Sequence, residues 1–473
     1  MKKKTKAHPE PPSPSDSQRR PVEKASIRNI VLLWLAWALI VIGFQALAAA
    51  RLQPQRPDML MWYPGDPTDE NFYQKGHPYL LEPFMNNQVW TDSEFYLGIA
   101  VGGYDDPCMM AMYLNLQGSV VPCTGAKYPS ADLPDGETIP VSYAFFPFYP
   151  LLIRLFSIPL SLLQLNPIAT ATLAGVIVSA LGTLAAMLAL YDLTRENETL
   201  GEDGAMRAVF YLLIFPTSFY FVQVYTEGVF VGLAFSCLAM LKRKKLVLAA
   251  LLAGAATVTR PVGVALVVPM AIIWLRTHIL PYLHFKKPYA LNLNWSQLNF
   301  KHLIGHALLA FTPLIVFLIW QFSYYGITFH YIETNMFGRP PLDPIKGYTL
   351  WSNIFNRMIA GFFQVPNPYG EIPSVQISAN YFVEFVCMAI GFIAILRCLK
   401  INFEVACFSL VVFLIPLVSG PPGIHRYLLA APAMFITLAH WGKNPVFDRI
   451  WTLASVLVMS LLAMLFAFNF WVA

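Results

Sequence analysis

The chain has 473 residues, of which 56% are hydrophobic and only 12% are charged. Soluble domains carry roughly a quarter charged residues, so this composition excludes an ordinary soluble protein and predicts an integral membrane protein. The net charge of +5 is concentrated at the N-terminus, where residues 1–28 hold eight Lys and Arg against three Asp and Glu. We interpret this Pro-rich segment as a disordered cytoplasmic tail; inside-positive tails are common, so nucleic acid is not an expected partner.

The first apolar run, residues 30–50, is long enough to cross a bilayer as an uncleaved helix. Residues 51–142 then form the longest polar interval, with twelve Asp and Glu against four Lys and Arg. A loop poor in basic residues that follows an inside-positive tail is expected outside. A disulfide between Cys108 and Cys123 is plausible in such a compartment.

Residues 142–163 are apolar but contain three prolines and Arg154, which disfavour a spanning helix. The basic run at 242–245 is a strong cytoplasmic signal, and counting spans back from it places residue 167 outside. We therefore expect 142–163 not to cross the membrane and interpret it as an interfacial or re-entrant helix pair on the outer leaflet.

The later loops alternate in charge as a multi-pass protein requires. Loop 276–302 holds four Lys and Arg and no acid, so it is expected inside, whereas 326–380 is expected to be a second external loop. The predicted domains are the tail 1–28 and an all-α transmembrane bundle over 29–473, with 51–167 as its external catalytic loop and an external C-terminus. The eleven predicted spans are residues 30–50, 168–193, 208–222, 229–241, 246–258, 262–275, 303–324, 381–396, 403–419, 428–441 and 450–470.

Several charged residues fall at the outer ends of these spans or in outer loops: Asp92, Glu94, Glu227, Arg260, His425 and Arg426. Charges near bilayer depth tend to be functional or paired, and acids with arginines on one face suit an anionic, lipid-borne substrate. Each residue also has a structural interpretation. The acids could cap helices, and the basic residues could anchor the chain at the interface.

Two stretches, D-S-E-F-Y-L-G-I-A-V-G-G-Y at 92–104 and A-F-F-P-F-Y-P at 144–150, resemble the paired signature of the PIG-V family. These are the GPI mannosyltransferase 2 enzymes and their prokaryotic relatives, within the GT-C glycosyltransferases. Y-T-E at 225–227, T-R-P-V-G at 259–263 and H-R-Y at 425–427 resemble further family motifs, in the same order.

One position departs from the family pattern. The family usually has Trp immediately before the Asp, whereas Thr91 separates Trp90 from Asp92 here. Glu94, or Asp105 and Asp106, could therefore share the role of Asp92.

The resemblance implies a GT-C-like fold and an inverting transfer of a sugar, with mannose expected, on the non-cytoplasmic face of a bacterial plasma membrane or the endoplasmic reticulum. The implied partners are a polyprenyl- or dolichyl-phosphate sugar donor, a glycolipid or glycan acceptor, and membrane lipids. An acceptor hydroxyl needs a carboxylate to take its proton, and arginine can hold phosphate oxygens bidentately. No cofactor is expected; a divalent metal is possible but no residue spacing indicates one.

These implications assign roles to particular residues. Asp92 is expected to be the catalytic base, with Glu94 as the second candidate. The expected ligands of the donor phosphate are Arg260, Arg426 and His425. The remaining expected substrate-site residues are Tyr96, Tyr104, Phe146, Tyr149, Tyr225 and Glu227.

Two other functions remain open. A transporter or flippase of a lipid-linked sugar would also use short, Pro-broken spans and charges within the membrane. Transporters usually have two related halves, and no such repeat is visible in this sequence. A GT-C transferase with another sugar or a protein acceptor is not distinguished by any sequence feature.

Overall fold

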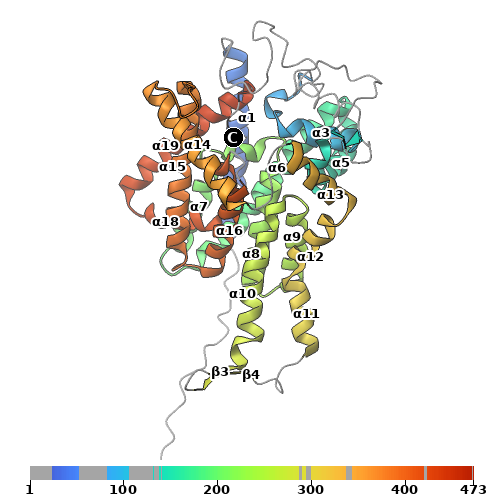
Figure 1. The fold of residues 1–473 in the computed structure, drawn as a ribbon, viewed down its shortest axis with the longest axis vertical. Coiled ribbons are helices and arrows are strands. Elements are labelled where there is room, and N and C mark those ends of the chain that lie inside the picture. Colours follow the sequence, from blue (N-terminus) through green and yellow to red (C-terminus); the bar gives the residue numbers. More distant parts are fainter. Residues whose placement is uncertain are drawn as a thin grey trace, which may run out of the picture.

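The structure is a computed structural model that describes residues 24–52, 82–105, 131–132, 138–139, 141–286, 290–293, 300–336, 343–419, 423–470 and 472. Asp106, Cys108, Cys123 and nearly all of the predicted tail lie outside the described residues. Within them the regular structure is helical apart from two short antiparallel hairpins, which confirms the predicted all-α class. Figure 1 shows the arrangement.

The longer helices are α1 (Lys24–Arg51), α3 (Asp92–Val101), α5 (Phe148–Leu160), α6 (Pro167–Arg195), α7 (Gly201–Ile214), α8 (Glu227–Lys242), α9 (Leu246–Thr257), α10 (Val267–His278), α11 (Phe300–Ala310), α12 (Thr312–Gln321), α13 (Tyr324–Tyr331), α14 (Pro344–Phe363), α15 (Val375–Cys398), α16 (Phe403–Ser419), α18 (Pro432–Trp441) and α19 (Pro445–Ala467). The short elements are η2 (Asn86–Gln88), β1 (Ala131–Asp132), β2 (Thr138–Ile139), η3 (Val141–Ala144), η4 (Ser161–Leu163), η5 (Ser218–Val222), η6 (Pro261–Leu266), η7 (Leu280–Tyr282), β3 (Leu283–Lys286), β4 (Ala290–Leu293), the π-helix η9 (Ile332–Met336), α17 (Ile424–Tyr427) and η10 (Leu428–Ala430).

Five helices of the described chain are long and apolar enough to cross a membrane, and the bent pair α11–α12 would be a sixth. These helices support an integral membrane protein. The other predicted spans contain shorter helices, some of them interrupted, so the number eleven stays a prediction. For example, the predicted span 208–222 is divided between α7 and η5.

Helices α6 and α8 pack backbone against backbone near the centre of the molecule (Figure 1). A Cβ atom on Gly228 would lie 2.1 Å from the carbonyl oxygen of Ser179, so only glycine allows this approach. The Ser179 hydroxyl also donates to the carbonyl oxygen of Tyr225, at 2.8 Å. The packing therefore fixes the position of Glu227, the first residue of α8.

Contacts sort the loops into two groups at opposite ends of α8. At the C-terminal end, Lys242 pairs with Glu196 at 3.1 Å, and Arg243 pairs with Asp192 at 2.8 Å. At the N-terminal end, the start of α3 contacts Tyr225 and Arg426, and Arg260 pairs with Glu227, the first residue of α8. The assignment of these loops to the two sides of a membrane stays a prediction.

Arg154, on α5, directs its side chain to the C-terminal end of α3. Its Nε donates to the carbonyl oxygen of Ala100 at 2.9 Å, and its Nη2 donates to that of Ile99 at 3.4 Å. These carbonyls belong to the last turn of α3, where a helix leaves acceptors open and a cation is favourable. The interfacial placement of this segment itself stays a prediction.

Candidate active site

The start of α3 is held against the loop that precedes α8. Tyr225 donates its hydroxyl to the carbonyl oxygen of Trp90 at 3.0 Å and shares a hydrogen bond with the hydroxyl of Thr91. Thr91 has a φ of 49°, which is costly for a β-branched residue at roughly 1–3 kcal/mol. The residue that separates Trp90 from Asp92 is therefore a strained corner from which α3 begins.

The T-R-P-V-G stretch places Arg260 by backbone geometry. Proline disfavours the helical conformation of the residue before it, and Arg260 is extended with φ −148° and ψ 140°. Gly263 then lets the chain turn back onto the end of α9, because a Cβ there would lie 2.7 Å from the carbonyl oxygen of Ala256. The guanidinium of Arg260 consequently reaches the start of α8.

The H-R-Y stretch makes up the last three residues of the four-residue helix α17, which is held by a buried acid on α15. Glu384 accepts hydrogen bonds from the backbone N–H groups of Gly423 and Ile424, at 2.7 and 2.6 Å. The His425 ring lies beside the same carboxylate, with Nδ1 3.7 Å from its oxygen. Glu384 thus positions the backbone from which Arg426 extends.

These segments bring two acids and two arginines together. Glu227 lies between the arginines, with one carboxylate oxygen 2.5 Å from Arg260 Nη1 and 3.2 Å from Arg426 Nε. Arg426 Nη2 lies 3.6 Å from a carboxylate oxygen of Asp92. The Asp92 side chain is 38% exposed, whereas that of Glu227 is 2% exposed. Glu227 is therefore the buried counter-ion, and Asp92 is the acid that a substrate can reach.

Aromatic rings surround both guanidinium groups. The Arg260 guanidinium lies 4.7 Å from the ring centre of Tyr427, and that of Arg426 lies 5.1 Å from Tyr220 and 5.2 Å from Tyr225. Such cation–π contacts orient an arginine without consuming its N–H donors, which leaves those donors for an anion.

Tyr96 lies on α3 within the same aromatic group. Its ring packs edge-on against Tyr225 and Tyr149, with centres 6.4 and 5.2 Å apart. Burial, with the negative charge of Asp92 second, raises the pKa of the Tyr96 hydroxyl well above its usual range. The hydroxyl therefore stays protonated and can act as a hydrogen-bond donor beside the cluster.

Other residues predicted for the site lie around the cluster or apart from it. Glu94 is 1% exposed, so a substrate cannot approach it as it can Asp92. Tyr149 is fully buried, and its hydroxyl contacts Ser179 and the carbonyl oxygen of Gly175. Phe146 stacks on Trp320 of α12, with centres 4.0 Å apart.

The acid Asp105, an alternative to Asp92, accepts a hydrogen bond from the Tyr143 hydroxyl at 3.0 Å. Tyr104 packs against the ring of the same Tyr143 and donates to the carbonyl oxygen of Phe145. No described contact joins either residue to the two arginines.

An apolar cavity of about 380 Å³ lies where the C-terminal end of α3 meets the start of α5. Tyr104 and Arg154 line it together with Phe148, Leu151 and Val258. Val258 is two residues before Arg260, so this cavity adjoins the segment that carries one of the site arginines.

Sequence reasoning missed Glu384, and it placed His425 among the phosphate ligands. His425 is 1% exposed beside Glu384, and neither of its ring nitrogens has a hydrogen-bond partner among the described residues. A phosphate could reach this ring only after α17 moved. An acid within the apolar segment 381–396 was the available signal, because charges in such segments are usually functional or paired.

No group of three or more His, Cys, Asp or Glu residues in the described ranges could hold a metal ion.

No protein-family model matches the chain, and no curated protein matches it in sequence. In fold it is similar to the oligosaccharyltransferase of Archaeoglobus fulgidus in the apo form, with 14% identity, a TM-score of 0.41, and 94% of this chain and 55% of that chain covered. ArnT from Cupriavidus metallidurans in the apo state shows 14% identity and a TM-score of 0.39, with 93% and 76% covered.

The archaeal oligosaccharyltransferase AglB from Archaeoglobus fulgidus, in complex with an inhibitory peptide and a dolichol-phosphate, shows 13% identity and a TM-score of 0.37, with 90% and 56% covered. The chain spans about half the length of the oligosaccharyltransferase chains it matches. Because all these TM-scores lie below 0.5, the function has to be inferred from the site itself.

Proposed function

We propose that this protein is a GT-C glycosyltransferase of the PIG-V type, acting as a mannosyltransferase. It would move the sugar from a polyprenyl- or dolichyl-phosphate donor to a glycolipid or glycan acceptor, with inversion. The observation that carries the proposal is the approach of the solvent-open Asp92 to two arginines that share the buried Glu227. Four separate chain segments meet to build it.

The geometry supports a single displacement. Asp92 takes the proton of the acceptor hydroxyl while that oxygen attacks the anomeric carbon, which avoids a high-energy oxonium product. On the opposite face of the sugar, the bond to the phosphate oxygen breaks and the lipid phosphate leaves with both bonding electrons. Arg426, and Arg260 beside it, stabilise the negative charge that develops on that phosphate.

Glu227 explains how two like charges persist side by side before the substrate arrives. The buried carboxylate between the two guanidinium groups offsets their mutual repulsion and keeps them close to each other. The remaining N–H donors are available to the phosphate, which can then bind between arginines that need no reorganisation.

The apolar cavity beside Val258 supports a lipid-linked donor. A polyprenyl chain is a continuous apolar partner for such a surface, and its phosphate end would lie toward Arg260. A soluble nucleotide-sugar donor has no apolar chain that could fill this cavity.

The test is incubation of the purified protein with labelled polyprenyl-phosphate-mannose and membrane lipids, followed by mass spectrometry of the product. Polyprenyl-phosphate-glucose and GDP-mannose serve as parallel donors. We expect a mannosylated glycolipid from the first donor only. Translocation of the intact donor across a vesicle membrane without transfer would instead show a flippase.

The proposal also places the site on the external or lumenal face, with residue 167 and the C-terminus on that side. Single cysteines at Asn166 and Ala473 test this in intact cells or sealed vesicles. We expect an impermeant maleimide added from the external or lumenal side to label both positions. Labelling of both only from the cytoplasmic side would invert the topology and contradict the proposed location.

A further inference from the structure

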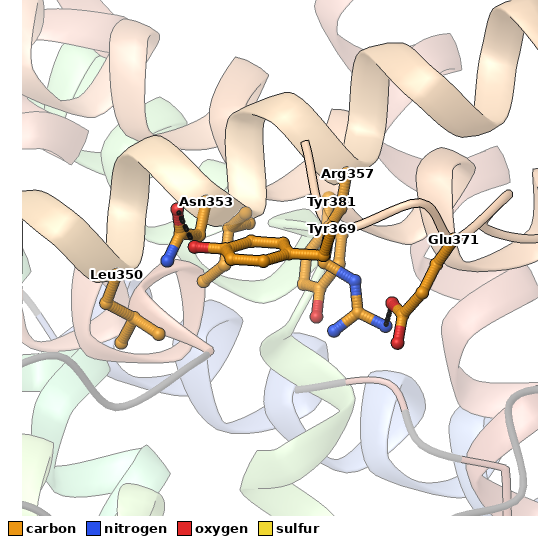
Figure 2. Close-up of a pocket in the computed structure, with 7 residues that line it drawn as sticks. Leu350, Asn353, Arg357, Tyr369, Glu371 and Tyr381 are labelled. Atoms are coloured by element: carbon orange, nitrogen blue, oxygen red, sulfur yellow. Dashed lines mark hydrogen bonds and ion pairs between the residues drawn. The ribbon is translucent and has the colours of Figure 1, made fainter. Parts of the chain in front are cut away.

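A second cleft, of about 340 Å³, opens between α14 and the segment that connects it to α15 (Figure 2). Its volume lies within the roughly 300–1,000 Å³ of small-molecule sites. The side chains labelled in Figure 2 are Leu350, Asn353, Arg357, Tyr369, Glu371 and Tyr381. Neither the acid and arginine cluster nor the cavity beside Val258 includes any of them.

The cleft wall is held in place by its own hydrogen bonds. The side-chain oxygen of Asn367 accepts from the backbone N–H groups of Tyr369 and Glu371, at 2.9 and 3.0 Å. The Tyr369 hydroxyl then donates to the Asn353 side-chain oxygen on α14, at 3.1 Å. Tyr369 and Glu371 are thereby presented to the cleft before any ligand binds, which lowers the entropic cost of binding.

The polar groups of the cleft suit a neutral polyol. Arg357 and Glu371 form a loose pair, with Nη2 3.8 Å from the carboxylate oxygen and side chains 42% and 65% exposed. Such an exposed pair contributes little to stability, so Arg357 and Glu371 can exchange their contact with each other for hydrogen bonds to a ligand at little cost. Arg357 Nε is buried and has no hydrogen-bond partner among the described residues. An anion beside Arg357 would also lie near Glu371, which disfavours a free phosphate.

Rings and planar polar groups together match a pyranose. Sugar hydroxyls both donate and accept, so adjacent hydroxyls can accept from the guanidinium of Arg357 and donate to the carboxylate of Glu371. The Tyr369 and Tyr381 rings line the same cleft as Arg357 (Figure 2) and offer apolar faces for the C–H face of the sugar.

Helix α14 has two different faces: one lines the cleft, and the opposite one is apolar. Leu350, Asn353, Ile354 and Arg357 follow the i, i+3, i+4, i+7 spacing of one helix face and line the cleft. The opposite face carries the exposed Tyr348, Phe355, Ile359 and Phe362. Apolar stripes of this kind typically lie on a lipid surface, which would turn the cleft toward water and disfavour a lipid tail as its occupant.

The cleft also connects to the candidate active site through α15. Tyr381 lies one turn before Glu384, and Glu384 holds the backbone of Gly423 and Ile424. Arg426, two residues further on, contacts Asp92. The cleft and Asp92 are thus linked through one turn of α15, the hydrogen bonds of Glu384 to α17, and the approach of Arg426 to Asp92.

We propose that this cleft binds a neutral hexose unit of the acceptor, and that it fixes the acceptor while another of its hydroxyls meets Asp92. The inference rests on the proposed transferase function and adds the substrate subsite. The donor sugar is not the occupant, because its phosphate belongs beside Arg260 and Arg426.

Binding is tested without turnover, using Asp92→Asn protein in nanodiscs. Saturation-transfer NMR is recorded with methyl α-mannopyranoside, methyl α-glucopyranoside and methyl β-galactopyranoside as probes. We expect saturation transfer to at least one probe, with at least tenfold weaker binding after Arg357→Gln or Tyr369→Ala. Tyr348→Ala, on the opposite face of α14, is the matched control and should bind as the parent does. Absence of binding to every probe, or equal binding in all variants, would overturn the inference.

Steady-state transfer by the same variants in the wild-type background separates this inference from the proposed function. We expect a KM for the acceptor at least tenfold higher in both cleft variants, with kcat and the donor KM unchanged. Normal transfer with an unchanged acceptor KM would reject the subsite alone. Sugar binding at the cleft without any transfer from polyprenyl-phosphate donors would reject the proposed function and the acceptor role together. Displacement of the sugar by inorganic phosphate would identify an anion site and overturn the neutral-hexose assignment.

Discussion

Helix α8 has an ionic cluster at each end, and the two clusters are built differently. At its C-terminal end Asp192 is 6% exposed and is paired with Arg195 at 3.3 Å and with Arg243 at 2.8 Å. At its N-terminal end Glu227 is equally enclosed by two arginines, but Asp92 beside them is 38% exposed and lies 3.6 Å from Arg426. In the first cluster the partly exposed Glu196 still pairs with Lys242 at 3.1 Å, whereas in the second the more exposed Asp92 has its nearest cation 3.6 Å away.

The two clusters also differ in the chain segments that supply their residues. The Asp192 cluster joins the ends of α6 and α8, which are already packed together, and so reinforces an existing helix pair. The cluster at Asp92 gathers α3, α8, the residue before η6, and α17. Bringing four segments together around arginines costs conformational entropy, and an acid left open gains little stability from it. The comparison therefore predicts chemistry at one end and a structural clamp at the other.

The largest effect is expected for Asp92→Asn. Asparagine is nearly isosteric, and Asp92 is the first residue of α3 with Thr91 at the N-cap and no side-chain cap hydrogen bond, so no cap is lost and the protein should fold and retain the donor. It cannot accept the acceptor's proton, and transfer should fall roughly a hundredfold to ten-thousandfold. Single-turnover transfer from labelled donor, with donor binding measured separately, gives both quantities.

Glu94→Gln is the control for this prediction. Because Glu94 is 1% exposed, its substitution should change stability more than the rate of the folded protein. Wild-type turnover by Asp92→Asn together with loss of activity in Glu94→Gln would move the base to Glu94. Normal turnover in both variants would place the site elsewhere.

The next effect is on stability. Glu227→Gln removes the counter-ion shared by Arg260 and Arg426, whose side chains are only 11% and 12% exposed. Breaking a buried ion pair in this way typically costs about 3–5 kcal/mol. A large fall in the thermal or denaturant midpoint of the detergent-solubilised protein is expected. A midpoint equal to that of wild type would mean that the arginines are already solvated, contrary to their burial.

Arg426→Lys and Arg260→Lys should lower transfer by roughly tenfold to a hundredfold. Lysine keeps the charge but not the fork of N–H donors that matches phosphate oxygens, so charge alone should not restore the rate. Arg243→Lys in the clamp is the matched control and should leave the rate unchanged. Unchanged activity and donor affinity in both site variants would remove the arginines from donor binding.

The convergence of Asp92, Glu227, Arg260 and Arg426 was predictable from sequence. The alternation of inside and outside loops along the chain, with the order of the motifs, predicts that all four lie at the outer ends of spans or in outer loops. The support from Glu384 was not, because its contact with Gly423 depends on how α15 and α17 pack rather than on local spacing. The charge pattern of the loops also could not predict which aromatic rings pack against each other. Phe146 lies next to a site motif in sequence, yet tertiary packing stacks it on Trp320.

The smallest effect is expected for Asp192→Asn at the other end of α8. The substitution weakens the hydrogen bonds from Arg195 Nε and Arg243 Nε, at 3.3 and 2.9 Å. Glu196 remains within 3.9 Å of Arg195 and 3.1 Å of Lys242, and the Arg243 side chain is already 35% exposed. The loss should therefore be about 1–3 kcal/mol, less than for Glu227→Gln.

At a temperature where Asp192→Asn is still folded, its kcat and both KM values should equal those of wild type. Stability is followed by the denaturant midpoint, and activity is measured per folded protein. The clamp contributes no donor or acceptor to the substrate, so only its stability should change. A fall in kcat comparable to that of the Arg→Lys variants would show that α8 transmits strain between its two ends, and the division into clamp and active site would then be wrong.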